Sequence, residues 1–574
     1  MTSETSKRAI FDPLLGFIED FVNGNAQEVL ARSSSLRQRI AAPIHAGLAD
    51  AKTREQQFDL IQQAIEAAER LFAETTADVS KETLMAIARR APAVFLDGAD
   101  LLLASLIVKH AAPDPDRTAT IHVGNTHNQV VALEGSELWA TFDGIAIAIT
   151  MNHLRDTARW LGKGGKLVAP SPVELTVDLP SEVKEAVAAY ERRRPGGRLF
   201  DAGGFFSPQP DPVKWSNYRI PVFMRVGGQM IEAPIGSERW LSFDRFASQM
   251  DGGGLARLLR HYDEALVEQW GVGADPILHV LTALAVQIFH SSPQLDLSRE
   301  RPGFTPSGTP EDTEHRIGFA FGLARKGFLR LPRATLPYSF GQVRSPLAPD
   351  QDEGERLTTA FLDAFLVGPE RARAMDVIAA KATPFFHLSA DEMVYIDLLL
   401  VGDFLAGVIE GAKEWYASQH GDRFVVNLKS WLDEAAPGCV AGARIPVALL
   451  DTTARSDIDL LVRRGDTLIT VECKAYAKSR AFMVGHPRAI TDRRGKIREA
   501  ARQAQRTCEA YRRQVAAGQT EFSPGTPVEW LVCSPTVEFL KPLGENGLFS
   551  EATPRIVTPE ELLEILRPDA AQGS

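Results

Sequence analysis

The stretch SDIDLLVRRGDTLITVECK, residues 456–474, decides the fold of the C-terminal part of this chain. Its two halves, 458–463 and 468–473, are rich in aliphatic and β-branched residues, which favour β-strands. Between them lie Gly465 and Asp466, a pair typical of a tight turn. We therefore predict two antiparallel strands joined by a two-residue loop, forming a β-hairpin.

The register of this hairpin brings charged side chains together. With a two-residue loop, Asp459 lies opposite Glu472, and the next pair outward on that face is Asp457 opposite Lys474. Directly opposed side chains have Cβ atoms about 4.5–5.5 Å apart, and like charges so placed destabilise a sheet. Facing carboxylates beside an ammonium group suit Mg²⁺ (or Mn²⁺), because these cations prefer oxygen ligands and the ammonium can orient a water molecule. The structural alternative is a surface salt bridge between Asp457 and Lys474, with Glu472 merely exposed.

The pattern D-I-D-L-L-V…G-D-T-L-I-T-V-E-C-K resembles the core of the PD-(D/E)XK, or restriction-endonuclease-like, nuclease superfamily. This sequence motif is most similar to the branch of nuclease-related (NERD), Mrr-type and Holliday-junction-resolvase-like domains. The resemblance covers the C-terminal part of the chain and implies an αβββαβ fold that hydrolyses phosphodiester bonds. It implies that Asp459 and Glu472 bind the metal and that Lys474 activates or positions the attacking water.

The resemblance implies two further acidic or amide positions. Related nucleases often have a glutamine in the next helix near the active site, and Gln503 is the better match, with Gln505 as the alternative. Many also have a glutamate in the first helix, but valine occupies the matching position within residues 424–426, and Glu434 comes late in that helix. Asp457 could substitute for this missing acid.

A basic segment follows the hairpin. Residues 451–514 contain 15 Lys and Arg residues against 8 Asp and Glu, although the whole chain has a net charge of −11. A positive island on an acidic protein is typical of a focused site for a polyanion, and a solvated helix face is the alternative. We predict a helix over 492–514 whose basic residues contact phosphates. The candidates are Arg493, Arg494, Lys496, Arg498, Arg502 and Arg506, followed by Arg512 and Arg513.

Composition restricts the class of protein. The chain has 574 residues, with 44% hydrophobic and 24% charged residues, which is typical of a soluble globular protein with several domains. Four scattered cysteines without a Cys-x-x-Cys pair argue against a disulfide framework or a zinc site. The N-terminus lacks the apolar segment of a signal peptide, and no apolar run is long enough to span a bilayer. We expect a cytoplasmic protein with no membrane partner.

Hydrophobic periodicity predicts an α/β protein of several regions. They are an α-helical N-terminal region (1–112), a mixed α/β region (113–290), a linker or long loops (291–354), a helical connector (355–420) and the PD-(D/E)XK-like domain (421–574).

Within these regions the pattern predicts individual elements. Helices are expected at 11–22, 54–72, 100–110, 145–161, 255–270, 276–290 and 355–382, and strands at 119–123, 129–133, 218–226 and 230–235. Residues 332–355 have the composition of a linker. Ser389 and Glu392 match a capping box, which predicts a long helix from there to about Gln419. Thr558 is expected to cap a final helix.

Three classes of function are compatible with these observations. The first is a metal-dependent nuclease, an endonuclease or exonuclease, acting on nucleic acid, with DNA as the expected substrate. The second is a nuclease fold that only binds nucleic acid or acts as a scaffold. In the third, residues 1–410 carry the main activity by selecting a target, binding partners or forming a homo-oligomer through the helical region. Restriction or anti-phage defence suits such an architecture by analogy alone.

Overall fold

The computed structural model of this protein describes most of the chain, and the statements below concern the described residues. These are 21–22, 24–90, 99–111, 119–123, 126–130, 135–171, 174–193, 219–232, 240–289, 327–345, 347–379, 383–389, 392–418, 421–448, 455–539 and 554–567. The part of the chain between residues 291 and 326, predicted to be a linker or long loops, lies outside them.

Helices form the first part of the fold. They are α3 (Ala26–Leu48), α4 (Arg54–Thr75), α5 (Lys81–Arg90), α7 (Asp100–His110) and α8 (Gly135–Gly162), with β1 (Ala119–Val123) and β2 (Thr126–Val130) as a small hairpin. Helix α4 begins at a capping box formed by Thr53 and Gln56, and it buries Phe58, Ile65 and Phe72 at helical spacing. The predicted helices at 54–72, 100–110 and 145–161 are confirmed. Of the predicted helix at 11–22, only residues 21–22 are described.

Strands and helices alternate in the next region. The elements are β3 (Lys166–Ser171), β4 (Glu174–Asp178), α9 (Ser181–Arg193), β5 (Arg219–Glu232), β6 (Trp240–Asp251), α11 (Gly252–His261), α12 (Asp263–Trp270) and α13 (Ala274–Phe289). The strands predicted separately at 218–226 and 230–235 form the single strand β5, which pairs with β6. The two glycines at 227–228 lie where the register shifts between Arg225 and Gln229, so they mark an irregularity in the ladder and do not end the strand.

Residues 332–355 are neither a linker nor a long loop, contrary to our prediction. They follow β7 (Phe328–Pro332) and contain α15 (Leu336–Gly341) and the start of α16 (Gln351–Phe365). Leu336 and Phe340 are fully buried in the largest apolar core, and the Asp350 carboxylate caps α16 by accepting the N–H of Glu353 at 2.9 Å. Helix α16 also ends before the predicted residue 382, and a short helix α17 (Pro369–Arg373) follows.

The long helix predicted from Ser389 to about Gln419 is also wrong in its first third. Residues Phe386–Leu388 form β8 and Met393–Asp397 form β9, which pairs with both β8 and β7, and α18 begins only at Val401 and ends at Ser418. The Ser389 N–H donates to the Met393 carbonyl oxygen at 2.8 Å, closing the turn between β8 and β9. The capping pattern therefore belongs to a hairpin turn, and Val394, Tyr395 and Ile396 are buried as strand residues.

The C-terminal part has the predicted order of elements. It contains α19 (Gly421–Ala435), β10 (Val440–Ala448), β11 (Arg455–Arg464), β12 (Thr467–Cys473), α20 (Arg480–Met483), α21 (Pro487–Ala516), β13 (Val528–Cys533), β14 (Ile556–Val557) and α22 (Pro559–Leu566). The five strands form one sheet in the order β10-β11-β12-β13-β14. The first three strands are antiparallel, and β13 and β14 add in parallel. Thr558 and Glu561 form the capping box of α22, as predicted.

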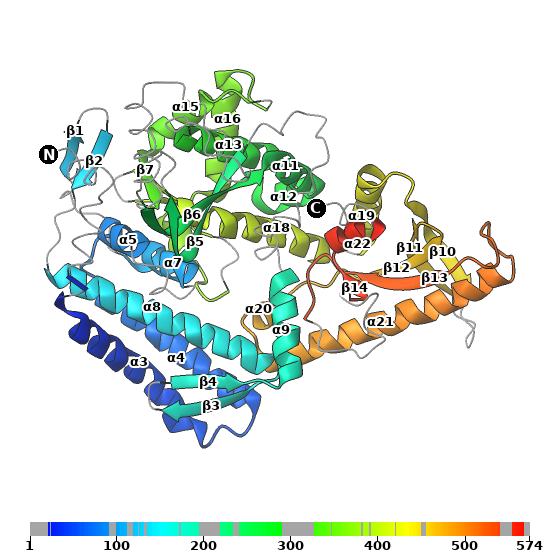
Figure 1. Cartoon of the computed structure of the whole chain (residues 1–574), viewed down its shortest axis with the longest axis horizontal. Helices are drawn as coiled ribbons and strands as arrows, with labels where there is room; N and C mark the ends of the chain where they lie inside the picture. Colours follow the sequence, from blue (N-terminus) through cyan, green and yellow to red (C-terminus); the bar gives the residue numbers. More distant parts are fainter. Residues whose placement is uncertain are drawn as a thin grey trace.

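Helices cover both faces of this sheet. Side chains of β11, β12 and β13 share one apolar core with α18, α19 and α22, and the opposite face packs on α21. Figure 1 shows α21 running along the sheet and extending to the helices of the N-terminal region. Among the described residues, no helix combines the length and apolar character needed to cross a membrane.

The segment between β12 and α21 lies against the rest of the protein. Val484 belongs to the apolar core of the N-terminal helices, whereas Phe482 and Ile490 pack with α9. Gly162, at the end of α8, approaches Gly485 so closely that a Cβ atom on Gly162 would lie 1.9 Å from the Gly485 carbonyl oxygen. The turn that precedes α21 is therefore fixed by contact of two backbones.

Candidate active site

The hairpin at the centre of the candidate site has the predicted register. Arg464 pairs with Thr467, and the ladder continues to Leu460 opposite Val471. Gly465 has a positive φ of 56°, the conformation that a tight two-residue loop requires and that glycine adopts without strain. The predicted loop is confirmed.

Asp459 and Glu472 meet where this ladder ends. The Asp459 carboxylate accepts the backbone N–H of Cys473 through Oδ2 at 2.7 Å. Strand alternation places Glu472 on the face of Leu468, which packs against α21, and its side chain is only 4% exposed. The two carboxylates thus lie at the buried end of the hairpin ladder. The hydrogen bond that Asp459 accepts from Cys473 joins the two strands there, so Asp459 has a structural role.

Lys474 pairs with Glu472 and not with Asp457. The Lys474 ammonium lies 2.6 Å from Oε1 of Glu472, whereas Asp457 is exposed and its backbone pairs with Pro446 of β10. The structural alternative, a surface salt bridge between Asp457 and Lys474 with an exposed Glu472, is therefore wrong. The physical reason is that the backbone of Lys474 pairs with β13 and not with β11, because its N–H donates to the carbonyl oxygen of Cys533 at 2.9 Å.

Burial perturbs the protonation of all three groups. It raises the pKa of Asp459, although the Cys473 N–H and the charge of Lys474 act in the opposite direction. Burial also raises the pKa of Glu472, and the charge of Asp459 adds to this shift against the hydrogen bond from Lys474. For Lys474, burial alone would lower the pKa, but the hydrogen bond and attraction of Glu472 raise it above its ordinary value. Two carboxylates that resist ionisation beside a cation are typical of functional sites.

Helix α21 places the two candidate glutamines differently. Thr507 faces the hairpin, because its hydroxyl lies 3.4 Å from that of Ser456 on β11. Gln503 is half-buried and precedes Thr507 by one helical turn, so it lies on the same face of α21. Gln505 is exposed and donates to Glu509 on the outer face at 3.2 Å. Gln503 is thus the only one of these two candidates on the hairpin side.

Arg493 is not available for phosphate, contrary to our prediction. Its guanidinium is buried and binds both carboxylate oxygens of Glu538, with Nε at 2.9 Å from Oε2, and Nη1 donates to the Ala477 carbonyl oxygen at 3.1 Å. The Ser534 hydroxyl donates to the same carboxylate at 3.0 Å. The inner face of α21 thus uses this arginine to fix the chain after β13.

The other predicted basic residues lie further out on α21. Arg494 is half-buried, and burial together with the charges of Arg498 and Arg54 lowers its pKa. Lys496 and Arg498 are exposed. Arg502 and Arg506 are exposed too, and both lie 3.4 Å from the carboxylate of Glu499. Such exposed ion pairs are weak, so Lys496, Arg498, Arg502 and Arg506 remain accessible to a polyanion, whereas Arg512 donates to the Val528 carbonyl oxygen at 2.7 Å.

Sequence reasoning missed Arg444 and Asp422. Burial raises the pKa of Asp459, and the charge of Arg444 on β10 opposes this shift. The Arg444 guanidinium lies 2.7 Å from the carboxylate of Asp422 in the first turn of α19. At the position in α19 where the resemblance led us to look for a glutamate, Val425 is buried and Val426 is exposed. The pairing of Arg444 with Asp422 joins elements distant in sequence, so no local pattern could have found it.

The donor set of this site can be compared with the needs of a metal. Among the residues that the structure describes, no group of three or more His, Cys, Asp or Glu side chains is arranged to hold a metal ion. Mg²⁺, however, commonly binds through one or two carboxylates and keeps several waters. Asp459 and Glu472 could supply two carboxylates, and a cation would offset both the burial and the repulsion from Asp459 that raise the pKa of Glu472. The residues fit a hydrated Mg²⁺ and do not form an all-protein cage.

Comparison of the chain with protein-family models, with curated proteins and with solved structures finds no match.

Proposed function

We propose that the C-terminal α/β unit is a metal-dependent nuclease that hydrolyses phosphodiester bonds, with DNA as the expected substrate. The observation that carries this proposal is the juxtaposition of Asp459, Glu472 and Lys474 at a buried strand end. Burial opposes the ionisation of both carboxylates, and this cost offsets part of what their contacts with the Cys473 N–H and with Lys474 contribute, so a function explains their presence better than folding alone. The resemblance to PD-(D/E)XK nucleases agrees with this reading.

Each residue of the candidate site would have its own role in phosphodiester hydrolysis. Asp459 and Glu472 would hold Mg²⁺ (or Mn²⁺), which when bound supplies an acidified water and stabilises the charge that develops on the phosphate. Because the pKa of Lys474 is raised, its side chain is protonated near neutral pH. It therefore acts as a hydrogen-bond donor that positions the water or an anionic oxygen, and it does not accept the proton. Gln503 would contribute a further polar contact from α21.

The basic outer face of α21 would orient the nucleic acid. Arg494, Lys496 and Arg498 lie on the same helix as Gln503, and Arg54 of α4 is close enough to perturb Arg494. Phosphate contacts of this kind position the nucleic acid without reading its sequence. The N-terminal region would then act in target selection, regulation or assembly, and a defence role remains an analogy.

A second candidate is a nuclease fold that binds nucleic acid or serves as a scaffold without cleaving. The observation in its favour is that Glu472 already has a cationic partner in Lys474 and that Asp459 already accepts a backbone N–H. In this reading, the cluster stabilises the strand end, and the basic face of α21 carries the activity.

Plasmid cleavage separates the two candidates. The intact protein should convert supercoiled plasmid with Mg²⁺ or Mn²⁺ but not with EDTA, and Asp459→Ala and Lys474→Ala should abolish this conversion. Asp466→Asn, at a fully exposed carboxylate in the turn of the same hairpin, is the control and should cleave normally. Cleavage that survives both site substitutions would sink the nuclease assignment. No cleavage, together with DNA retention that weakens when Arg498 and Arg502 are neutralised, would favour the scaffold.

A further inference from the structure

A cavity of about 600 Å³ lies apart from the candidate nuclease site. It is bounded by α12, α16, α18, α20 and the loop of residues 374–379, and most of its lining is apolar. Aromatic rings supply much of this surface, with Trp270 and Phe365 at 6.1 Å between ring centroids and Phe404 beside Phe365 at 5.1 Å. Cavities of several hundred Å³ with apolar walls are typical of sites for small organic molecules.

A few polar groups break this apolar lining. Arg480 donates through Nε to the Asp376 carboxylate at 2.5 Å, and its side chain is more than half exposed. Arg371 donates to the carbonyl oxygens of Ala364 and Leu366 at 2.7 and 3.3 Å. Two guanidinium groups and one carboxylate thus line the cavity, which leaves one excess positive charge. Glu66 of α4 does not line the cavity, but its negative charge also attracts the Arg480 guanidinium, less strongly than Asp376 does.

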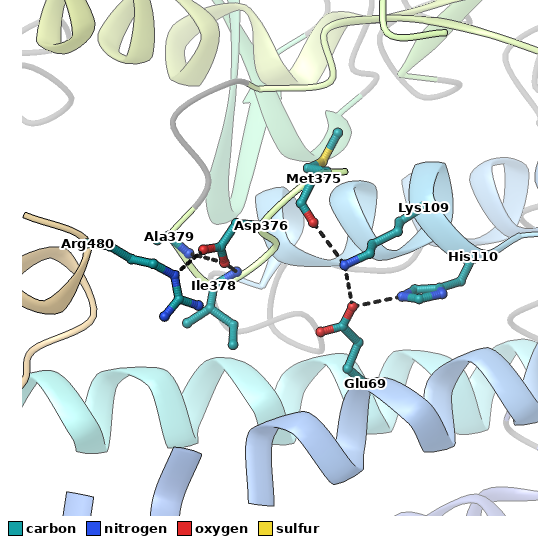
Figure 2. Close-up of polar contacts among 8 residues, drawn as sticks. All are labelled: Glu69, Lys109, His110, Met375, Asp376, Ile378, Ala379 and Arg480. Carbon is teal, nitrogen blue, oxygen red and sulfur yellow. Dashed lines mark hydrogen bonds and ion pairs between the residues drawn. The ribbon is translucent and has the colours of Figure 1, made fainter. Parts of the chain in front are cut away.

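The loop that carries Asp376 is held in place from both sides. Figure 2 shows Lys109 of α7 donating to the Met375 carbonyl oxygen at 2.9 Å, while Glu69 of α4 lies 2.8 Å from Lys109 and accepts from His110. On the other side, Arg480 of α20 donates to the Asp376 carboxylate, which also accepts, within the loop itself, the N–H groups of residues 378 and 379, each at 3.1 Å. The walls are therefore preformed, which reduces the entropy lost when a ligand binds.

We propose that this cavity binds a small organic anion with a planar aromatic ring system. The rings of Trp270, Phe365 and Phe404 offer stacking and edge contacts to a planar ligand. The exposed guanidinium of Arg480 has donors beyond Nε, which can bind a carboxylate, sulfonate or phosphate. This inference does not rest on the nuclease proposal, and binding alone tests it.

Two fluorescent probes that share one ring system and differ by a sulfonate group provide the test. We use 8-anilinonaphthalene-1-sulfonate and its neutral counterpart N-phenyl-1-naphthylamine with the full-length chain. The sulfonate should bind saturably at one site per chain. Arg480→Gln should weaken sulfonate binding about tenfold, because a charge-assisted contact is lost, and should leave the neutral probe within about twofold. Arg480→Lys, which keeps the charge, should recover part of the loss.

A cavity-blocking variant and its control locate the bound probe. Ala374 lines the cavity and is exposed, so Ala374→Trp can fill the space without crowding a packed core, and both probes should then lose binding. Ala46→Trp, at an exposed helical alanine on α3, should change neither probe. The proposal is overturned if the sulfonate does not saturate, if Ala374→Trp leaves it bound, or if Arg480→Gln leaves its affinity unchanged.

Discussion

Arg493 provides a sharp test, because the sequence and the structure assign it different roles. Replacing it with methionine keeps the aliphatic part of the side chain and removes the guanidinium. The side chains of Arg493 and Glu538 are 8% and 0% exposed, so the substitution leaves a carboxylate buried without its cation. Removing one partner of a buried, hydrogen-bonded ion pair costs about 3–5 kcal/mol of unfolding free energy. We expect Arg493→Met to lose stability in this range.

Hydrogen exchange of the backbone amides in α21 and β13 measures this loss locally, which suits a protein of several folding units. The double variant Arg493→Met with Glu538→Met should lose much less than Arg493→Met alone, since no buried charge is left unpaired. Arg498→Met, an exposed matched control, should stay within about 0.5 kcal/mol of the intact protein. The reasoning is refuted if Arg493→Met leaves exchange unchanged while weakening nucleic-acid binding with a lower salt dependence, because that result describes a phosphate contact.

Three further predictions concern charge. Asp459→Asn should raise the melting temperature at pH 7 in EDTA by a few degrees and leave it unchanged below about pH 4. The reason is that the pKa of Asp459 is raised in the folded protein, so ionising this group costs stability only as the pH rises past the ordinary pKa of about 3.9. A lower melting temperature of Asp459→Asn at pH 7 would contradict this. Burial alone would raise the pKa of Glu560, but its ion pair with Lys413 lowers this pKa to about 2. The stability that the ion pair of Glu560 and Lys413 contributes should therefore be present above about pH 4.3 and be lost as the pH falls towards 2. Lys413→Met should accordingly cost about 3–5 kcal/mol near neutral pH and less in acid, as pH-dependent denaturation would show. If α21 binds nucleic acid, Lys496→Gln and Arg498→Gln should each reduce the slope of log affinity against log salt by about 0.9 in filter binding, and an unchanged slope would exclude them as phosphate contacts.

The hairpin was predictable because its determinants are local. The alternation of aliphatic residues and the Gly465-Asp466 turn lie within one short stretch, and together they set the pairing that places Asp459 near Glu472. The same holds for the capping box of α22 at Thr558. Side-chain partners were less predictable, as Lys474 shows, since its backbone turns toward β13 and its ammonium toward Glu472.

Predictions failed where distant parts of the chain decide the structure. The basic residues of α21 look alike in sequence, but Arg493 is buried because it pairs with Glu538, which lies 45 positions later in the chain. The pattern at Ser389 and Glu392 resembles a helix start, yet the pairing of Met393–Asp397 with β7 outweighs it. Contacts of this kind are set by tertiary packing, which no local pattern encodes.

The most direct test of the nuclease proposal is the single-turnover rate at which Glu472→Gln cleaves a labelled DNA duplex in Mg²⁺, relative to the intact protein. Glutamine keeps the size of the side chain but removes the charge that would hold the metal. We predict a loss of at least about a hundredfold, with no loss for Asp466→Asn in the exposed turn of the same hairpin. A Glu472→Gln protein that cleaves at the rate of the intact protein would contradict a metal-dependent site at Asp459 and Glu472.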